Sequence, residues 1–424
     1  MKKVILYVVT ASMIFGNYAC NKEEYTVSFE CNGGTPVPAK QTVKDDGKIT
    51  EPAPLTLDGY TFDGWYEDIE LTQKYDFETP VTADLILYAK WNENMNTSGT
   101  TGSLTWVITD GKLIISGTDE MPNYDYVYDN GNNISTAPWF KYRSSFSAVV
   151  IEDGVRSIGN WSFAFCNGLT STIFGKSIMS IGEYAFYGCS SLTELTIPNS
   201  VTSIKDFAFG SCNGITSVTI PNSVTEIGNW SFSFCSGLTS VTIPNSVTEI
   251  GYAVFHSCSG LTSVTIPNSV TSIRLSAFEN CSSLTEIVIP NSVIYIGSSA
   301  FWGCSSLTEV TIPNSVTYIG SEAFRGCSSL TTVNFNAVNC ADMKRIQRHN
   351  MQAGMYYTFY GCNKLTTVNI GSEVTKIPTY AFSDCSGLTG TLSIPNSVTS
   401  IGEMAFYNCS GLTSVSIGNS VTTI

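Results

Sequence analysis

The chain offers few side chains for acid–base or metal chemistry. Its 424 residues include two histidines, His256 and His349, which fall in different repeats. Glu226 and Glu249 lie one repeat apart, and paired carboxylates can in principle hydrolyse glycosides. They occupy the same position of the repeat, however, which is typical of a solvated edge. Without a serine elbow, zinc helix motif or phosphate loop in the sequence, we expect no catalytic residue, no cofactor and no enzymatic activity.

Cysteine is the reactive residue that recurs most regularly. Eleven of the 14 cysteines share one repeat position, namely Cys166, Cys189, Cys212, Cys235, Cys258, Cys281, Cys304, Cys327, Cys362, Cys385 and Cys409. Metal sites favour closer pairs such as C-x-x-C, and thiols stacked one strand apart have poor disulfide geometry. We therefore expect these cysteines to point inward as small apolar residues, with no metal. Cys31 and Cys340 stand outside the series, and the sequence does not pair them.

The cysteines belong to a repeated unit of 23 residues that contains Ile-Pro-Asn-Ser-Val-Thr. The unit that starts at Ile181 has two short apolar runs, with corners at Gly182 and at Pro198-Asn199. It has no continuous helical period, and a fixed period in the twenties is typical of a solenoid. We expect a mostly β fold of about eleven coils, stacked about 4.8 Å apart as neighbouring strands are.

This unit resembles the BspA-type leucine-rich repeat of bacterial surface proteins. The shared pattern is Leu-Thr-x-Val-Thr-Ile-Pro followed by Ser-Val-Thr-x-Ile-Gly-x-x-Ala-Phe-x-x-Cys, and it covers residues 158–424. The resemblance implies a solenoid without the helix of ordinary leucine-rich repeats. Residues 103–157 contain a hairpin signature and are expected to cap the first coil. The last copy stops at Ile424, halfway through a coil, so we expect either further residues or a docked partner there.

Two irregularities interrupt the repeat. The distance from Cys327 to Cys362 is 35 residues, twelve more than the period, because of a basic insertion near residues 336–355. We expect this insertion to form a loop on one face, with a docking knob for an acidic partner as the alternative. A slip of one residue at Gly390-Thr391 is typical of a β-bulge.

Residues 25–92 form a separate predicted domain. The sequences Gly59-Tyr60-x-Phe-x-Gly-Trp65-Tyr66 and Tyr88-Ala89-Lys90-Trp91 resemble the Listeria–Bacteroides repeat, which implies a small β-grasp-like module that spaces other domains. We expect Trp65 and Trp91 to be core residues, with ligand platforms as the alternative. Residues 93–102 are rich in Asn, Thr, Ser and Gly and are predicted to be a flexible linker.

The N-terminus is typical of an export signal. Residues 1–19 combine a short positive start with an apolar stretch too short to span a bilayer, and Cys20 follows a small residue. This segment resembles a bacterial lipoprotein signal, which implies lipid attachment at Cys20 and a tether over residues 20–24. The alternative is an ordinary secretory peptide. We expect a location at the outer membrane or cell surface, with the lipid as the only membrane anchor.

The charge of the chain limits its partners. The formal net charge is −14, so nucleic acid and anionic lipid headgroups are poor partners for the surface. Positions that vary between coils are the candidates for ligand contact, because we expect them to face solvent. One set is aromatic: Trp161, Tyr184, Phe207 and Trp230. The other set follows the repeat phenylalanine: Tyr187, His256, Trp302 and Arg325. The alternative for the first set is that its rings pack against the coil below.

These features indicate a binding protein. The BspA-type resemblance implies adhesion, in which the solenoid binds a protein of the host matrix or of another cell. A glycan-binding accessory protein at the bacterial surface is the alternative, and a purely structural spacer is a third possibility. Binding carried by Trp161, Tyr184 and Trp230 and competed by free sugars would favour a glycan.

Overall fold

The computed structural model describes residues 24–57, 59–93, 97–129, 131–341 and 357–424. The chain divides into two compact units, residues 1–94 and 95–424. The predicted signal peptide, Cys20 and residues 342–355 of the predicted insertion lie outside the described residues. Within the described part, no helix is both long and apolar enough to cross a membrane.

The first unit contains a four-stranded mixed sheet in the order β2-β1-β4-β3. Its strands are β1 (Glu24–Glu30), β2 (Gln41–Lys44), β3 (Tyr60–Tyr66) and β4 (Leu85–Glu93). The central strands β1 and β4 run parallel, as in a β-grasp sheet. Trp65 is buried at 1% exposure, which confirms its place in the core. Trp91 is half-buried and donates its indole N–H to the carbonyl oxygen of Cys31 at 2.9 Å, so it also packs on this unit.

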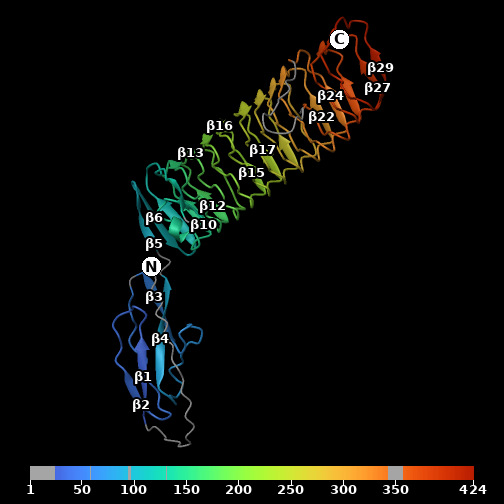
Figure 1. Ribbon diagram of the computed structural model, residues 1–424. Helices are drawn as coiled ribbons and strands as arrows, with labels where there is room; N and C mark the ends of the chain where they lie inside the picture. The colour runs from blue at the N-terminus through green and yellow to red at the C-terminus, as the bar shows by residue number, and fades with distance from the viewer. Residues whose placement is uncertain (1–23, 58, 94–96, 130, 342–356) are drawn as a thin grey trace, which may run out of the picture. The chain divides into compact units, whose positions relative to one another are not determined.

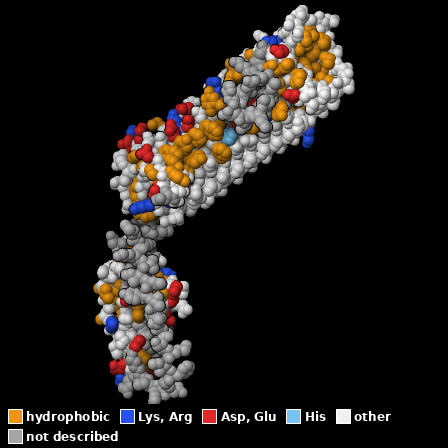
Figure 2. All heavy atoms as spheres, viewed as in Figure 1, with side chains coloured by type: hydrophobic (Ala, Val, Ile, Leu, Met, Phe, Trp, Pro, Cys, Tyr) orange, Lys and Arg blue, Asp and Glu red, His pale blue; other side chains and the backbone are white. Residues whose placement is uncertain are grey.

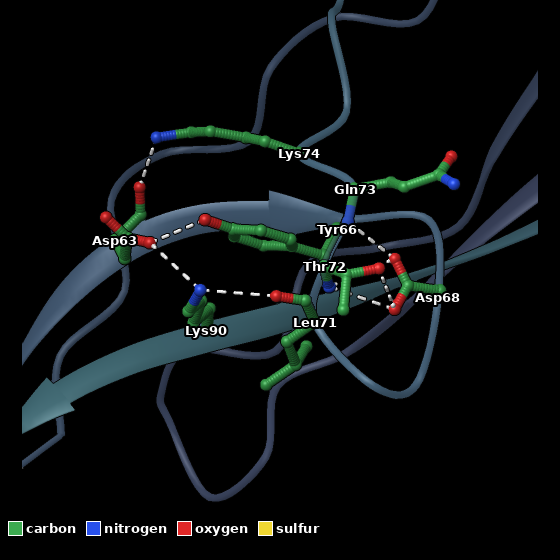
Figure 3. A network of polar contacts seen from close by, with 8 residues as sticks. All are labelled: Asp63, Tyr66, Asp68, Leu71, Thr72, Gln73, Lys74 and Lys90. Atoms are coloured by element: carbon green, nitrogen blue, oxygen red, sulfur yellow. Dashed lines mark hydrogen bonds and ion pairs between the residues drawn. The ribbon is translucent and has the colours of Figure 1, made fainter.

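A polar network joins β3 to β4 and to the loop between them (Figure 3). The hydroxyl of Tyr66 donates to the Asp63 carboxylate at 2.6 Å, and this bond is the main reason that the pKa of Asp63 is lowered. Lys90 lies 3.9 Å from the same carboxylate and donates to the carbonyl oxygen of Leu71. The Asp68 carboxylate accepts from the loop backbone, including the N–H of Thr72 at 2.9 Å. These polar groups therefore fix the shape of the module.

The second unit begins with a five-stranded sheet in the order β12-β10-β7-β6-β5. The strands are β5 (Thr97–Thr101), β6 (Leu104–Thr109), β7 (Lys112–Ser116), β10 (Ala148–Ile151) and β12 (Ser171–Phe174). Because β5 pairs with β6 along its whole length, the prediction of a flexible linker over residues 93–102 is wrong for residues 97–101. Gly99 lies against the indole ring of Trp106, and a side chain at Gly99 would clash with this ring. The predicted linker therefore ends in a strand.

The predicted cap continues directly into the repeats. Strand β7 pairs in parallel with β10, and β10 pairs in parallel with the first repeat strand β12. Between β7 and β10 the chain forms the hairpin β8 (Tyr126–Asp129) and β9 (Asn132–Ser135) and a 3-10 turn, η1 (Phe140–Tyr142). Trp139 is fully buried, and its ring stacks on that of Phe163 in the first coil at 5.6 Å. The cap thus covers the apolar end of the solenoid, as expected of a first coil.

Each coil contributes to one or both of two parallel ladders of short strands (Figure 1). After β12, the first ladder contains β15 (Ser217–Thr219), β17 (Ser240–Thr242), β19 (Ser263–Thr265), β22 (Glu309–Ile312), β24 (Thr332–Phe335), β25 (Thr367–Ile370), β27 (Gly390–Ile394) and β29 (Leu412–Ile417). The second contains β11 (Ser157–Ile158), β13 (Ser180–Ile181), β14 (Ser203–Ile204), β16 (Glu226–Ile227), β18 (Glu249–Ile250), β20 (Ser272–Ile273), β21 (Tyr295–Ile296), β23 (Tyr318–Ile319), β26 (Lys376–Ile377) and β28 (Ser400–Ile401). Ser217 pairs with Ser240, so the register advances by one repeat per coil.

The interior of the solenoid is a continuous apolar core built from equivalent residues. The repeat phenylalanines stack ring on ring, for example Phe186 on Phe209 with centroids 5.3 Å apart. The repeat cysteines point inward as predicted, and all but Cys409 are buried. The thiol of Cys189 donates to the carbonyl oxygen of Phe163 in the preceding coil at 3.1 Å, and the next coils repeat this bond. The cysteines thus satisfy backbone acceptors inside the core.

Cys31 and Cys340, which stand outside the series, also lie in cores. Cys31 is buried in the first unit and Cys340 in the second. The predicted bulge is confirmed, because the register between β27 and β29 shifts between Gly390 and Thr391. Gly390 has a φ of +74°, a left-handed conformation that glycine adopts at little cost.

A candidate binding surface on the solenoid

Four aromatic residues that vary between coils share one backbone position with a left-handed conformation. Trp161, Tyr184, Phe207 and Trp230 have φ values between +53° and +59°. In this conformation each backbone N–H points toward the following coil. The N–H of Trp161, for example, donates to the carbonyl oxygen of Glu183 at 3.0 Å. Smaller residues hold the same position in later coils, namely Ala253, Ser276 and Ser299. The left-handed backbone conformation therefore does not require an aromatic side chain at this position.

The four rings form a continuous stack that crosses the coils. The ring centroids of Trp161 and Tyr184 are 4.1 Å apart, those of Tyr184 and Phe207 are 4.6 Å apart, and those of Phe207 and Trp230 are 5.6 Å apart. Neighbouring ring planes are parallel within 7°. Tyr126 from β8 adds a fifth ring by stacking on Trp161 at 5.0 Å. The alternative prediction, that the rings pack against the neighbouring coil, describes this arrangement better than free projection into solvent.

A second row of rings lies beside the stack. Tyr187 meets the rings of Trp161, Tyr184 and Phe207 edge-on, at interplanar angles of 65°, 68° and 73°. We call the two rows together the aromatic surface, and it comprises Tyr126, Trp161, Phe165, Tyr184, Tyr187, Phe207, Trp230, Phe234 and His256. Figure 2 shows hydrophobic side chains gathered on one face of the solenoid. It is separate from the longer stack of repeat phenylalanines, which lies in the core and runs from Phe163 to Phe406.

Most of the aromatic surface is half-buried, and its accessible parts are unequal. Phe234 is 42% exposed and Tyr126 is 41% exposed, whereas the stacked rings between them are less accessible. Acidic side chains border the stack, since the exposed Glu183 precedes Tyr184 and Asp206 precedes Phe207. The pKa of Tyr184 is raised mainly by burial, and these two carboxylates add to the rise. The surface is therefore apolar at its centre and negative at one rim.

His256 lies at the end of the aromatic surface. Its ring centroid is 5.0 Å from that of Trp230, and its Nδ1 is 3.7 Å from the carboxylate of Glu279. Burial lowers the pKa of His256, and the charge of Glu279 opposes that shift. The expectation that residues after the repeat phenylalanine face solvent is wrong at this point, because Glu279 is 9% exposed and Ser233 is fully buried. The ring of His256, from the preceding coil, lies against the Glu279 carboxylate.

Trp302 and Arg325 form a separate cluster in later coils. The guanidinium of Arg325 lies 5.1 Å from the ring centroid of Trp302 and 5.6 Å from that of Tyr360. It also forms an ion pair with Glu322 at 3.3 Å. The structure therefore places these two predicted ligand residues in contact with each other, and the described contacts do not join them to the aromatic surface.

Sequence reasoning missed three members of the aromatic surface. Phe165 and Phe234 could have been found in the sequence, because the coils that contain Trp161 and Trp230 both have a Phe-x-Phe-Cys sequence. Tyr126 had none, because it comes from the hairpin β8–β9 of the cap and reaches Trp161 only through the tertiary fold. In the described residues, no group of three or more His, Cys, Asp or Glu side chains is placed to hold a metal ion.

The fold and repeat define the class of protein as a leucine-rich-repeat solenoid. The chain belongs to the BspA type leucine rich repeat region family, whose model matches residues 136–262, 253–351 and 352–424. The first unit matches the Listeria-Bacteroides repeat domain over residues 25–90. A solved structure of a leucine-rich repeat protein from Bacteroides ovatus is similar, with a TM-score of 0.52 and 25% identity, covering 77% of this chain and 90% of that one.

Two curated relatives each match a short stretch of the chain. A protein of Evansella cellulosilytica named "Putative Gly-rich membrane protein" is 48% identical over 73 residues, which is 17% of this chain and 8% of the relative. A "Putative membrane protein" of the same organism is 51% identical over 71 residues, which is 16% of this chain and 10% of the relative. The chain thus spans about a tenth or less of the length of these relatives.

Proposed function

We propose that this protein is a cell-surface adhesin that binds a partner protein through the aromatic surface. The membership of a repeat family found on bacterial surfaces supports binding rather than catalysis. The names of the two Evansella relatives support a place at the membrane. Lipid attachment at Cys20 is the anchor that we propose on the sequence pattern described above, and a protein of the host matrix or of another cell is the proposed partner.

The covered ring faces are the observation that carries this proposal. Trp161, Tyr184 and Phe207 each have another ring stacked on both faces, so only their edges are accessible. A pyranose packs its C–H groups on an open ring face, and the stack does not offer one at these positions. Protein side chains pack well against ring edges, and aromatic clusters are enriched where proteins bind one another.

The negative charge at the rim indicates which surface chemistry the partner has. Glu183 and Asp206 lie next to the stack, and the whole chain has a net charge of −14. Charge complementarity at a rim accelerates association and suppresses wrong partners. The proposed partner therefore presents apolar side chains surrounded by lysine or arginine. Its association with this protein weakens as the salt concentration rises.

The test is a binding assay of the full chain on arrayed matrix proteins, including collagen, fibronectin and laminin. Tyr187→Ala and Phe234→Ala are each expected to weaken binding to the matrix protein that the unchanged chain binds by about tenfold, as for residues near the centre of an interface. Tyr407→Ala is the matched control, because Tyr407 occupies the position of Tyr187 in a distant coil and is 54% exposed. Equal binding by all three variants, or competition by free sugars, would contradict the proposal. No binding to any protein would favour the structural spacer.

A further inference from the structure

A second site lies far along the solenoid, at the last of several interruptions in the first ladder. Strand β25 pairs with β24, and β27 pairs with β29, but β25 and β27 do not pair with each other. The extra residue at the bulge between Gly390 and Thr391 changes the register at this point. A cleft of about 300 Å³ lies between the two strands. Its volume is at the lower end of the range for small-molecule sites.

The walls of this cleft combine apolar and polar groups. Val368, Leu388 and Leu392 line the cleft and are themselves buried, so the cleft reaches between the strands toward the core. Asn369 and Thr391 line its exposed part. Among the residues that line it, none carries a charge. A ligand for this cleft is therefore neutral and has both apolar and polar sides.

Hydrogen bonds within the protein leave the polar wall rich in acceptors. The side-chain N–H of Asn369 donates to the side-chain oxygen of Asn334 at 2.8 Å. The Oδ1 atom of Asn369 therefore remains as a hydrogen-bond acceptor. The hydroxyl of Thr366 donates to the carbonyl oxygen of Thr331, which leaves its oxygen as an acceptor. Thr391 and Ser414 share one hydrogen bond at 2.6 Å. A fitting ligand must bring several O–H or N–H donors.

A second hollow starts at the next residue along the chain. Ile370 lines the cleft, and Gly371 lines a hollow of about 280 Å³. Three asparagines from successive coils line this hollow, Asn291, Asn314 and Asn336, together with Glu373. Amide and carboxylate groups can each contact two neighbouring hydroxyls, so the hollow suits the same chemistry.

We propose that the cleft between β25 and β27 is a site for a neutral oligosaccharide, with the hollow at Gly371 as a further subsite. A sugar brings several hydroxyl donors for the acceptors on the wall and C–H faces for Val368 and Leu392. An extended peptide fits less well, because it offers one main-chain N–H per residue and a strand inserted here would need β25 and β27 about 9.6 Å apart. This site is independent of the aromatic surface.

The proposal is tested with the full chain on an array of neutral oligosaccharides, alongside arrayed peptides of twelve residues. We expect binding of at least one neutral oligosaccharide, and a loss of affinity of about tenfold or more in the double variant Asn369→Ala, Thr391→Val. The matched control is Ser240→Val, Thr242→Ala, at equivalent positions on β17, which pairs with both neighbours. Deletion of Gly390 should also abolish binding. It restores the repeat length of 23 residues, so β27 can pair with β25 and close the cleft.

The outcomes separate this site from the proposed adhesin function. The double variant changes exposed side chains, so its thermal unfolding should match that of the unchanged protein even if the deletion variant fails to fold. Tyr187→Ala should leave saccharide binding unchanged. The proposal is overturned if no neutral oligosaccharide binds, if the double variant binds as well as the control, or if the cleft residues instead carry peptide binding.

Discussion

Trp161 and Tyr184 lie in successive coils with their ring centroids 4.1 Å apart and their ring planes within 4° of parallel. Both residues hold a left-handed backbone conformation, with φ values of +58° and +53°. Such a conformation costs an ordinary residue about 1–2 kcal/mol. The N–H bond from each residue to the next coil offsets that cost, and the stacked rings add stability between coils.

This relationship predicts that Tyr184→Ala destabilises the solenoid by about 2 kcal/mol. The substitution removes two stacked pairs, with Trp161 and with Phe207, and each is worth about 0.5–1.5 kcal/mol. The measurement is urea unfolding followed by tryptophan fluorescence. Ser276→Ala is the control, because Ser276 has the same backbone position and conformation without a ring. A similar loss in both variants would show that the position matters and the stack does not.

The repeat made most of the solenoid predictable from the sequence. An apolar period of 23 residues fixes which side chains face inward, and Cys258 and Phe255 are buried as the pattern requires. The bulge at Gly390 was readable for the same reason, because one extra residue is visible against a constant period. In a regular repeat, residues one period apart occupy equivalent places in neighbouring coils, because each coil packs on the next in the same register.

The candidate site was only partly predictable. Variation between coils identified Tyr184 and Trp230, but it did not tell whether a varied position faces solvent. Glu279 is buried because the side chains of adjacent coils cover it, which depends on the neighbours and not on its own type. The strand Thr97–Thr101 was missed because its polar composition is typical of a linker, whereas pairing with β6 decides its structure.

The buried thiols predict a loss of stability in alkali. Burial raises the pKa of Cys235 to about 12, from 9.0 for an ordinary thiol. Above pH 9 the unfolded chain releases this proton and the folded chain does not, so the free energy of unfolding falls as pH rises toward 12. One such thiol contributes a slope of about −1.4 kcal/mol per pH unit. Urea unfolding at pH 7.5, 9 and 10.5 measures this slope.

The variant Cys235→Ala isolates one thiol from the background of tyrosine ionisation. It should be less stable at pH 7.5, because it loses packing and the bond to the carbonyl oxygen of Phe209 at 3.2 Å. Its stability should then fall less steeply above pH 9 than that of the unchanged protein. Parallel curves for the two proteins would contradict the assigned pKa.

His256 predicts a second dependence on pH, on the acid side. Its pKa is lowered from 6.5 mainly by burial, so the unfolded chain takes up a proton before the folded chain does. The free energy of unfolding therefore falls as pH drops through 6.5, by at most about 1.4 kcal/mol per pH unit. His256→Gln should reduce the difference in stability between pH 7.5 and pH 5.5. An unchanged difference would show that other groups cause the acid sensitivity.

The N-terminal module should unfold independently of the solenoid, because the described residues of the two units form separate apolar cores. Trp65 is 1% exposed, and its ring contacts Phe29 at 4.9 Å and Phe62 at 5.6 Å. Removing a buried tryptophan costs about 3–5 kcal/mol, which equals the whole stability of many domains of this size. Calorimetry of Trp65→Ala should therefore show the solenoid transition alone.

The control for this experiment is Tyr60→Ala, on the same strand, because Tyr60 is 41% exposed. This variant should keep both calorimetric transitions, with a change of about 0.5 kcal/mol or less in the module. A shift of the solenoid transition in Trp65→Ala would show that the two units stabilise each other. Loss of both transitions together would mean that the module and the solenoid fold as one cooperative unit, because a single core substitution would then unfold both.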